Sequence, residues 1–389
     1  MDFINLLGAG AWPEGNFWAS LIKLFDVGSY AWTIILFTVI LKLVLSPLDF
    51  LQRYYTNKTT RAQAKLQPEL QKLQKRYGQN QTLLAQKQNE LYQKNNVGMK
   101  GSCIVMLIYM VVTLTVFMTL YSSLGTISNY KINAQFEELQ STYHQSYDVE
   151  YEQEYLENYL QINIDDYNAQ DDKENFVKAK EDDKVAEFKQ TLTEEEAIAK
   201  FESEKSAILK TAEQNGQELV FKHYDQIKDS WLWIKNIWRA DNPTVKQILN
   251  YSDFKSATKT TVLETEYNAV MGKLLSDPQT DSANGYYILS AIVVIVSFVS
   301  QLITRKMSQP KTKDGEVVAT PGAGKIMMFI MPLIMMFFTL SSSAMFAIYI
   351  ITNSLIATIL TPVTTIVCNK IEDKKEKDKK DKNKAIYSR

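Results

Sequence analysis

The sequence predicts an all-α membrane protein with five transmembrane helices, a cytoplasmic helical hairpin and an extracytoplasmic helical insertion. Three observations lead to this class: segregated charge, long uncharged stretches, and basic loops between them. The 389 residues carry a net charge of only −1. Residues 125–285, however, contain 31 acidic and 17 basic residues, whereas the rest of the chain contains 13 acidic and 26 basic residues. One acidic segment therefore masks a basic membrane protein.

The apolar stretches are long enough for five spans. Residues 103–124 are uncharged over 22 positions, 286–304 over 19, and 326–369 over 44. At about 1.5 Å per residue, the last stretch would form a helix of roughly 66 Å, twice the roughly 30 Å hydrocarbon core, so we expect two spans there. The predicted spans are 29–48, 102–124, 286–304, 326–341 and 343–368.

The basic loops predict the orientation. Residues 48–100 hold 10 basic and 3 acidic residues, 305–325 hold 5 and 2, and 369–389 hold 9 and 5. Because lysine and arginine accumulate on the cytoplasmic side, we expect the hairpin at 49–101, the loop at 305–325 and the tail at 369–389 to be cytoplasmic. The N-terminal segment 1–28, with an interfacial amphipathic helix, and the insertion 125–285 would face outward. The tail has too few apolar residues to fold, so we expect it to be disordered.

Lys42 is the one charge within the first predicted span. A lysine near the centre of a spanning helix costs roughly 2.5–3.5 kcal/mol, so such residues usually face a bundle interior or a water-filled cavity. Thr38 lies four residues earlier and therefore on the same helix face. We expect a polar partner to meet this face within the membrane.

Two further segments have helical patterns. In the predicted hairpin, Leu66, Leu70, Leu73 and Tyr77 follow the 4-3-4 spacing of a coiled-coil seam. In the insertion, tyrosine recurs every fourth residue from position 143 to 159. This tyrosine stripe is either the core of a small helical domain or a docking face.

The order of several motifs resembles the YidC/Oxa/Alb-type membrane protein insertase family. Lys42 and Pro47 are followed by QPELQKLQKRYG and NELYQKNNVGMKGSC, and later by WLWIKNIWRADNP, KIMMFIMPLIMMFF and AIYIITNS. The resemblance implies a hydrophilic groove that opens to cytoplasm and lipid and contains a positive charge. The family usually has arginine where this sequence has Lys42. In the second span, either Tyr109 or Thr113 takes the groove position. The other groove positions implied are Thr38, Gln301, Tyr349 and Asn353.

The resemblance also implies a function and partners. The chain would be an insertase and folding chaperone of the bacterial cell membrane, with nascent membrane proteins and lipid as partners. The charge of the tail fits two alternatives, namely contact with a ribosome together with the basic hairpin, or a plain solubilising tail. A Sec translocon is a further candidate partner. The sequence has two histidines in all, and they suggest neither a catalytic triad nor a metal cluster. We therefore expect no enzymatic activity, no cofactor and no metal site. We also expect no DNA partner.

Two alternative functions fit parts of the sequence. In a small-solute or proton-coupled transporter, Lys42 would be the intramembrane site, but such proteins often have internal repeats that this sequence lacks. In a membrane-anchored adhesin, residues 125–285 would be the active part. That reading explains neither the hairpin nor Lys42.

Overall fold

A computed structural model describes Pro13 and residues 15–95, 99–308 and 322–387. Its regular structure is helical: besides the helices, two isolated β-bridges are present in these residues. Four helices have segments long and apolar enough to cross a membrane, namely Tyr30–Ala62, Cys103–Tyr159, Ile288–Met307 and Ala344–Lys375, and a shorter apolar segment spans Phe329–Ser341. The predicted all-α membrane class is confirmed. The count of five spans stays a prediction.

The chain divides into two compact units. The first unit, called here the outer unit, comprises 1–13, 127–238 and 243–284. The second, called here the bundle unit, comprises 14–126, 239–242 and 285–389. The chain passes between the two units several times, once within α4 (Met99–Glu150).

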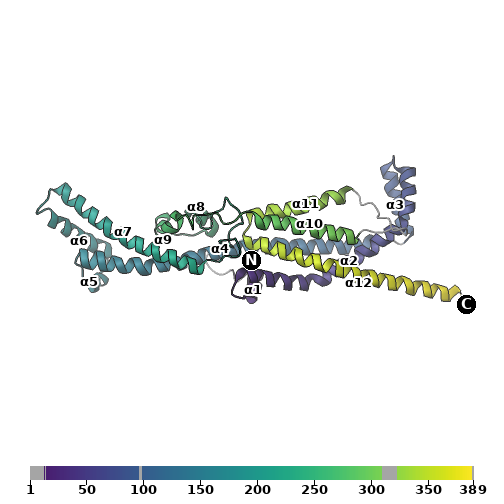
Figure 1. Ribbon diagram of the computed structural model, residues 1–389, viewed down its shortest axis with the longest axis horizontal. Coiled ribbons are helices and arrows are strands. Elements are labelled where there is room, and N and C mark those ends of the chain that lie inside the picture. Colours follow the sequence, from purple (N-terminus) through teal and green to yellow (C-terminus); the bar gives the residue numbers. More distant parts are fainter. Residues whose placement is uncertain (1–12, 14, 96–98, 309–321, 388–389) are drawn as a thin grey trace. The chain divides into compact units, whose positions relative to one another are not determined.

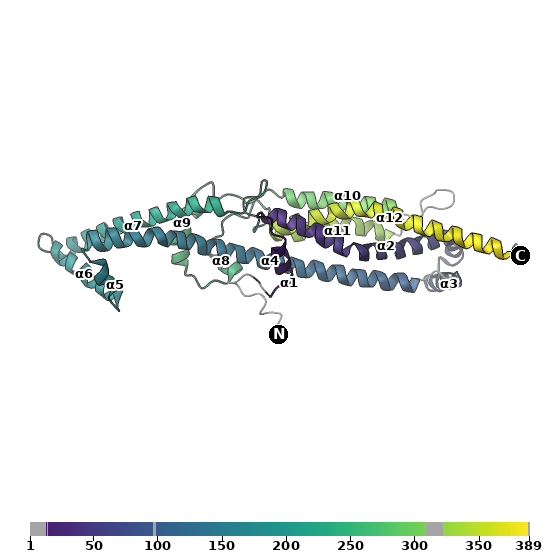
Figure 2. The same ribbon diagram turned by 90° about the horizontal axis from the view of Figure 1, so that it is seen from below.

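In the bundle unit, α2 (Tyr30–Tyr77), α10 (Ile288–Ser308), α11 (Gly322–Ser341) and α12 (Ala344–Tyr387) lie side by side (Figures 1 and 2). The short α1 (Phe17–Leu24) buries Ala19 and Ile22, and its Trp18 Nε1 donates to Thr119 Oγ1 of α4 at 2.8 Å. Its Phe17 and Leu24 are exposed, which suits a helix lying at a membrane interface.

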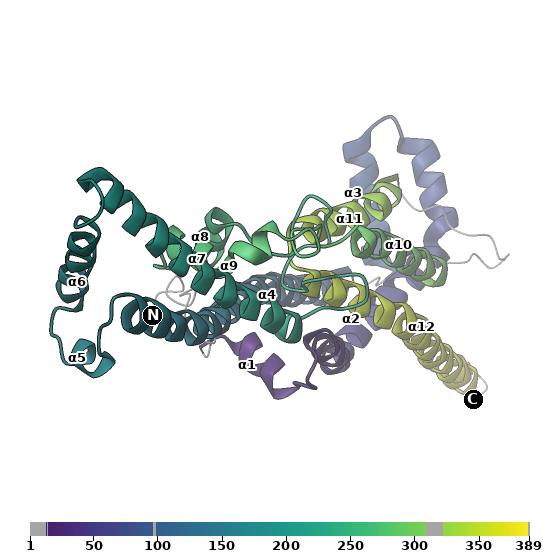
Figure 3. The same ribbon diagram turned by 60° about the vertical axis from the view of Figure 1, so that its left-hand side comes forward.

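The hairpin pairs the last part of α2 with α3 (Gln81–Lys94) and projects from the bundle (Figure 3). Its core is thin, because Leu66 and Leu84 are buried whereas most neighbouring side chains remain accessible. Asn80 is the N-cap residue of α3, and its side-chain oxygen accepts the backbone N–H of Leu83 at 3.1 Å.

Where the sequence predicts a disordered tail, the structure continues α12 to Tyr387. The spacing of charges gives a physical reason. Acidic residues precede lysines by four positions at Asp373–Lys377 and Asp378–Lys382, and this order stabilises a helix. Composition alone therefore underestimated the helix-forming tendency of the tail.

The start of α10 depends on a residue far away in the sequence. The buried Asp241 accepts the backbone N–H groups of Tyr286 at 2.7 Å and Leu289 at 2.6 Å, and so caps the first turn of α10. Close by, the backbone N–H of Ala344, the first residue of α12, donates to the carbonyl of Arg239 at 2.8 Å. The segment 239–242 thus fixes the starts of two apolar helices.

The outer unit is built on the last part of α4, the π-helix η2 (Tyr151–Tyr159), α5 (Ile164–Asn168), α6 (Lys173–Phe188), α7 (Glu194–Ile227), α8 (Tyr251–Thr258) and α9 (Glu264–Ser276). Figure 2 shows α7 running along α4 within this unit. Thr193 and Glu196 form a capping box at the start of α7.

The tyrosine stripe is part of the core of this unit. Tyr143 and Tyr155 are buried, and successive rings stack, with centroids 5.3 Å apart for Tyr143–Tyr147 and 5.9 Å for Tyr155–Tyr159. On an α-helix, a four-residue spacing drifts by about 40° per step. The switch to a π-helix at Tyr151, with its wider turn, opposes this drift and keeps the later rings in the stack.

Candidate functional site

Lys42 lies in the apolar first part of α2, and its ammonium forms an ion pair with Asp49 on the same helix. The Nζ and Oδ2 atoms are 2.8 Å apart, and the two side chains are only 13% and 12% exposed. Seven residues make nearly two turns of a 3.6-residue helix, so Lys42 and Asp49 share one face. The sequence leads us to expect a polar partner for Lys42 but does not identify it. In the structure this partner is Asp49.

The helix continues between these two residues despite Pro47. Proline has no N–H, so it leaves the carbonyl of Leu43 without its usual helical partner. The hydroxyl of Ser46 donates to this carbonyl at 2.8 Å. Hydroxyl groups of this kind allow a proline inside a membrane helix. The predicted end of the first span near Pro47 is therefore not the end of the helix, and Asp49 stays in register with Lys42.

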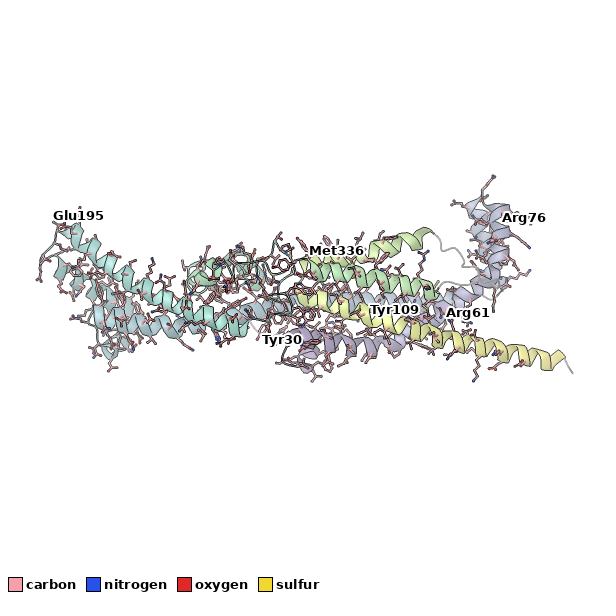
Figure 4. The ribbon with its side chains drawn as sticks, in the orientation of Figure 1. Tyr30, Arg61, Arg76, Tyr109, Glu195 and Met336 are labelled. Carbon is pink, nitrogen blue, oxygen red and sulfur yellow. The ribbon has the colours of Figure 1, made fainter. Side chains whose placement is uncertain are left out.

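Tyr109 of α4 completes the partner set of Asp49. It lies close enough to Asp49 and Arg53 for its hydroxyl to interact electrostatically with both side chains. Arg53 Nη2 donates to Thr361 Oγ1 of α12 at 2.5 Å. We call these five residues the Lys42 cluster: Lys42, Asp49, Arg53, Tyr109 and Thr361. Figure 4 marks Tyr109 within the bundle unit.

Further along α2 towards its C-terminal end, additional polar contacts hold α2 and α12 together. Arg61 donates to Asp373 Oδ1 at 2.7 Å and to Asn369 Oδ1 at 2.9 Å; it is labelled in Figure 4. Arg53 and Thr361 are 308 positions apart, and so are Arg61 and Asn369. This constant offset shows that α2 and α12 run in the same direction.

The other predicted groove residues make different contacts. Thr38 is 1% exposed and donates its hydroxyl to the Ile34 carbonyl at 2.6 Å. Thr113 likewise donates to the Tyr109 carbonyl at 2.8 Å. Tyr349 is buried, with its ring centroid 6.0 Å from that of Phe346.

Gln301 on α10 and Asn353 on α12 are both partly buried. Of the predicted residues, the structure thus brings Lys42 and Tyr109 together, through Asp49. The described hydroxyl bonds of Thr113 are to backbone carbonyls of its own helix, and which of Tyr109 and Thr113 lines a groove stays a prediction.

Sequence reasoning missed Asp49 and Arg53. Both lie beyond Pro47, in the segment predicted to form the hairpin, although the sequence shows their spacing from Lys42. Among the described residues, no group of three or more His, Cys, Asp or Glu side chains is placed to hold a metal ion.

Comparison with known proteins finds similarity in part of the chain. Residues 22–164, which contain α2, α3 and α4, match the family model of the 60Kd inner membrane protein. The chain is 32% identical over 111 residues to membrane protein insertase YidC of Fusobacterium nucleatum, a match that covers 28% of this chain and 52% of the relative. Over these residues the chain is thus similar to the 60Kd inner membrane protein family and to YidC insertases.

Two further YidC insertases match over similar lengths. The YidC insertase of Clostridium perfringens is 40% identical over 99 residues, which cover 24% of this chain and 38% of the relative. That of Enterococcus faecalis is 32% identical over 120 residues, which cover 30% and 41%. The chain thus spans about half the length, or less, of these relatives. No solved structure matches it.

Proposed function

We propose that this protein is a membrane protein insertase that moves short polar segments of nascent membrane proteins across the bilayer. The observation that carries the proposal is the charged Lys42 cluster on an apolar helix, in a chain whose matching relatives are named membrane protein insertases. Nascent membrane proteins are accordingly the proposed substrates.

The proposed path is a hydrophilic groove that opens to the cytoplasm and to lipid. Unsatisfied polar groups are costly in hydrocarbon, so a groove that admits water shortens the apolar distance a polar segment must cross. The Lys42 cluster would line this groove, together with Thr38, Gln301, Tyr349 and Asn353. The positive charge of Lys42 would attract acidic residues of the segment.

The second span supports a site that is accessible from lipid. Along the first half of α4, the side chains of Ile104, Leu107, Ile108 and Val111 are each more than half exposed within the protein. This face would be available to a hydrophobic substrate helix. The substrate helix would leave sideways into lipid, driven by about 0.8 kcal/mol per buried methylene, so no nucleotide would be required.

The proposed topology has the N-terminus outside and the C-terminus in the cytoplasm of a bacterial cell. The parallel direction of α2 and α12 supports an odd number of spans, and hence five rather than four, if these helices are the first and last. The hairpin, with Arg76 near its tip (Figure 4), and the basic end of α12 would then be cytoplasmic and accessible to a ribosome. A Sec translocon is a further proposed partner.

Reconstitution tests the function directly. The purified full chain is placed in lipid vesicles, and a single-span protein with a short acidic outer segment is synthesised outside them. We expect the acidic segment to become protected from added protease only in vesicles that contain the protein. Equal protection in empty vesicles would contradict the proposal.

A further inference from the structure

The Lys42 ammonium, which the proposed function needs as an attractive charge, already has an anionic partner. Asp49 Oδ2 lies 2.8 Å from Lys42 Nζ, and both side chains are about seven-eighths buried. Together the two groups have no net charge. A carboxylate of a passing segment therefore does not meet a bare ammonium, and it must compete with Asp49 for it.

Such competition is possible because Asp49 has another donor at hand. The hydroxyl of Tyr109 on α4 lies close enough to interact electrostatically with the Asp49 carboxylate, and Arg53, one helical turn further along α2, interacts with the same tyrosine. A guanidinium has five N–H donors, and the hydrogen bond described for Arg53 is to the neutral hydroxyl of Thr361. Tyr109 and Arg53 can therefore hold Asp49 when Lys42 turns to another carboxylate.

We propose that Asp49 is a specificity-determining counter-ion, which a translocated segment displaces from Lys42 only if the segment carries an acidic residue of its own. The inference rests on the insertase function proposed above and adds a selection step to it. In the resting state the pair keeps the ammonium neutralised inside the bundle, where an isolated charge is costly. In the engaged state the substrate carboxylate takes the place of Asp49.

Two variants test this proposal, and they are expected to change the measured insertion ratio in opposite directions. The measured quantity is a ratio: insertion of a segment with two aspartates divided by insertion of a segment with two lysines. Asp49→Asn removes the carboxylate that competes for Lys42, so this ratio should rise by about fivefold or more. Fivefold is the lower end of typical coupling between sites. Tyr109→Phe removes the hydroxyl that holds displaced Asp49, so the same ratio should fall. A segment with two asparagines gives the baseline for each variant.

Matched controls come from the same helices. Asp373→Asn removes an acidic group that pairs with Arg61, and Tyr54→Phe removes a hydroxyl that accepts from Lys375. Both lie outside the Lys42 cluster, and neither should change the ratio. Insertion is measured with the full chain in vesicles, after each variant has been shown to be present in equal amounts.

The outcomes separate this inference from the function itself. If Asp49→Asn leaves the ratio unchanged, or reduces insertion of acidic and basic segments equally, the counter-ion role is wrong even though insertion by the wild-type protein stands. If Asp49→Asn does not fold, Tyr109→Phe decides alone, and an unchanged ratio overturns the proposal. If the wild-type protein inserts none of the segments, the insertase function itself fails.

Discussion

Replacing Lys42 by alanine is expected to reduce insertion of segments with acidic residues by about ten- to a hundredfold. The reason is the loss of a hydrogen bond between charged groups, which is typically worth about 1.5–3 kcal/mol. Lys42→Arg keeps the positive charge and should retain most of the activity, although its planar group has a different geometry. Protease protection in reconstituted vesicles measures both variants.

Two controls define what this result means. A segment without acidic residues should be inserted almost equally by wild type and Lys42→Ala, because it does not use the ammonium. The double variant Lys42→Ala with Asp49→Asn should recover part of the lost insertion, since it removes the negative charge that Lys42 no longer neutralises and that repels an acidic segment. Equal loss for acidic and neutral segments would mean that Lys42 serves only folding.

Gly285→Ala is expected to destabilise the bundle unit by about 1–3 kcal/mol, the usual effect of overpacking. A Cβ atom at Gly285 would overlap the carboxylate of Asp241 and also approach its Cα to 2.9 Å. Asp241 is buried and caps α10, so it cannot move away without releasing the backbone N–H groups that it holds. Thermal unfolding in detergent should show a lower midpoint.

Gly125→Ala is the matched control. Gly125 lies within α4, and a Cβ atom there would meet nothing within 4 Å. Alanine is a better helix former than glycine by about 1 kcal/mol, so this variant should be neutral or slightly stabilising. If both glycine variants have the same midpoint, the tight packing around Asp241 is not required for stability.

The membrane class could be predicted from the sequence because hydrophobic length and charge are nearly sufficient to define it. Lys42 was identifiable for the same reason, as a single charge in an apolar stretch. Asp49 was not, because proline usually ends a helix, and the hydroxyl bond from Ser46 to Leu43 that carries the helix past Pro47 is visible only in three dimensions.

In the outer unit, features that depend on local sequence patterns could be predicted, whereas features that depend on long-range contacts could not. The capping box at Thr193 and the burial of Tyr143 and Tyr155 follow from spacing along one helix. The π-helix that keeps the tyrosine rings in contact leaves no such pattern in the sequence. In the bundle unit, the same limit applies to the cap that Asp241 provides for α10, since the two segments are 45 or more positions apart.

We expect a nascent segment to contact the Lys42 cluster during insertion. Thr38 and Tyr349 are buried, so a bulky probe fits better at Tyr109, which is aromatic and only partly buried. A photo-crosslinking phenylalanine derivative at position 109 should capture a stalled nascent chain that carries an acidic segment, with a higher yield than the same probe at Phe337, an exposed aromatic residue of α11. Capture at position 337 but not at 109 would contradict a role of the Lys42 cluster in contacting the segment.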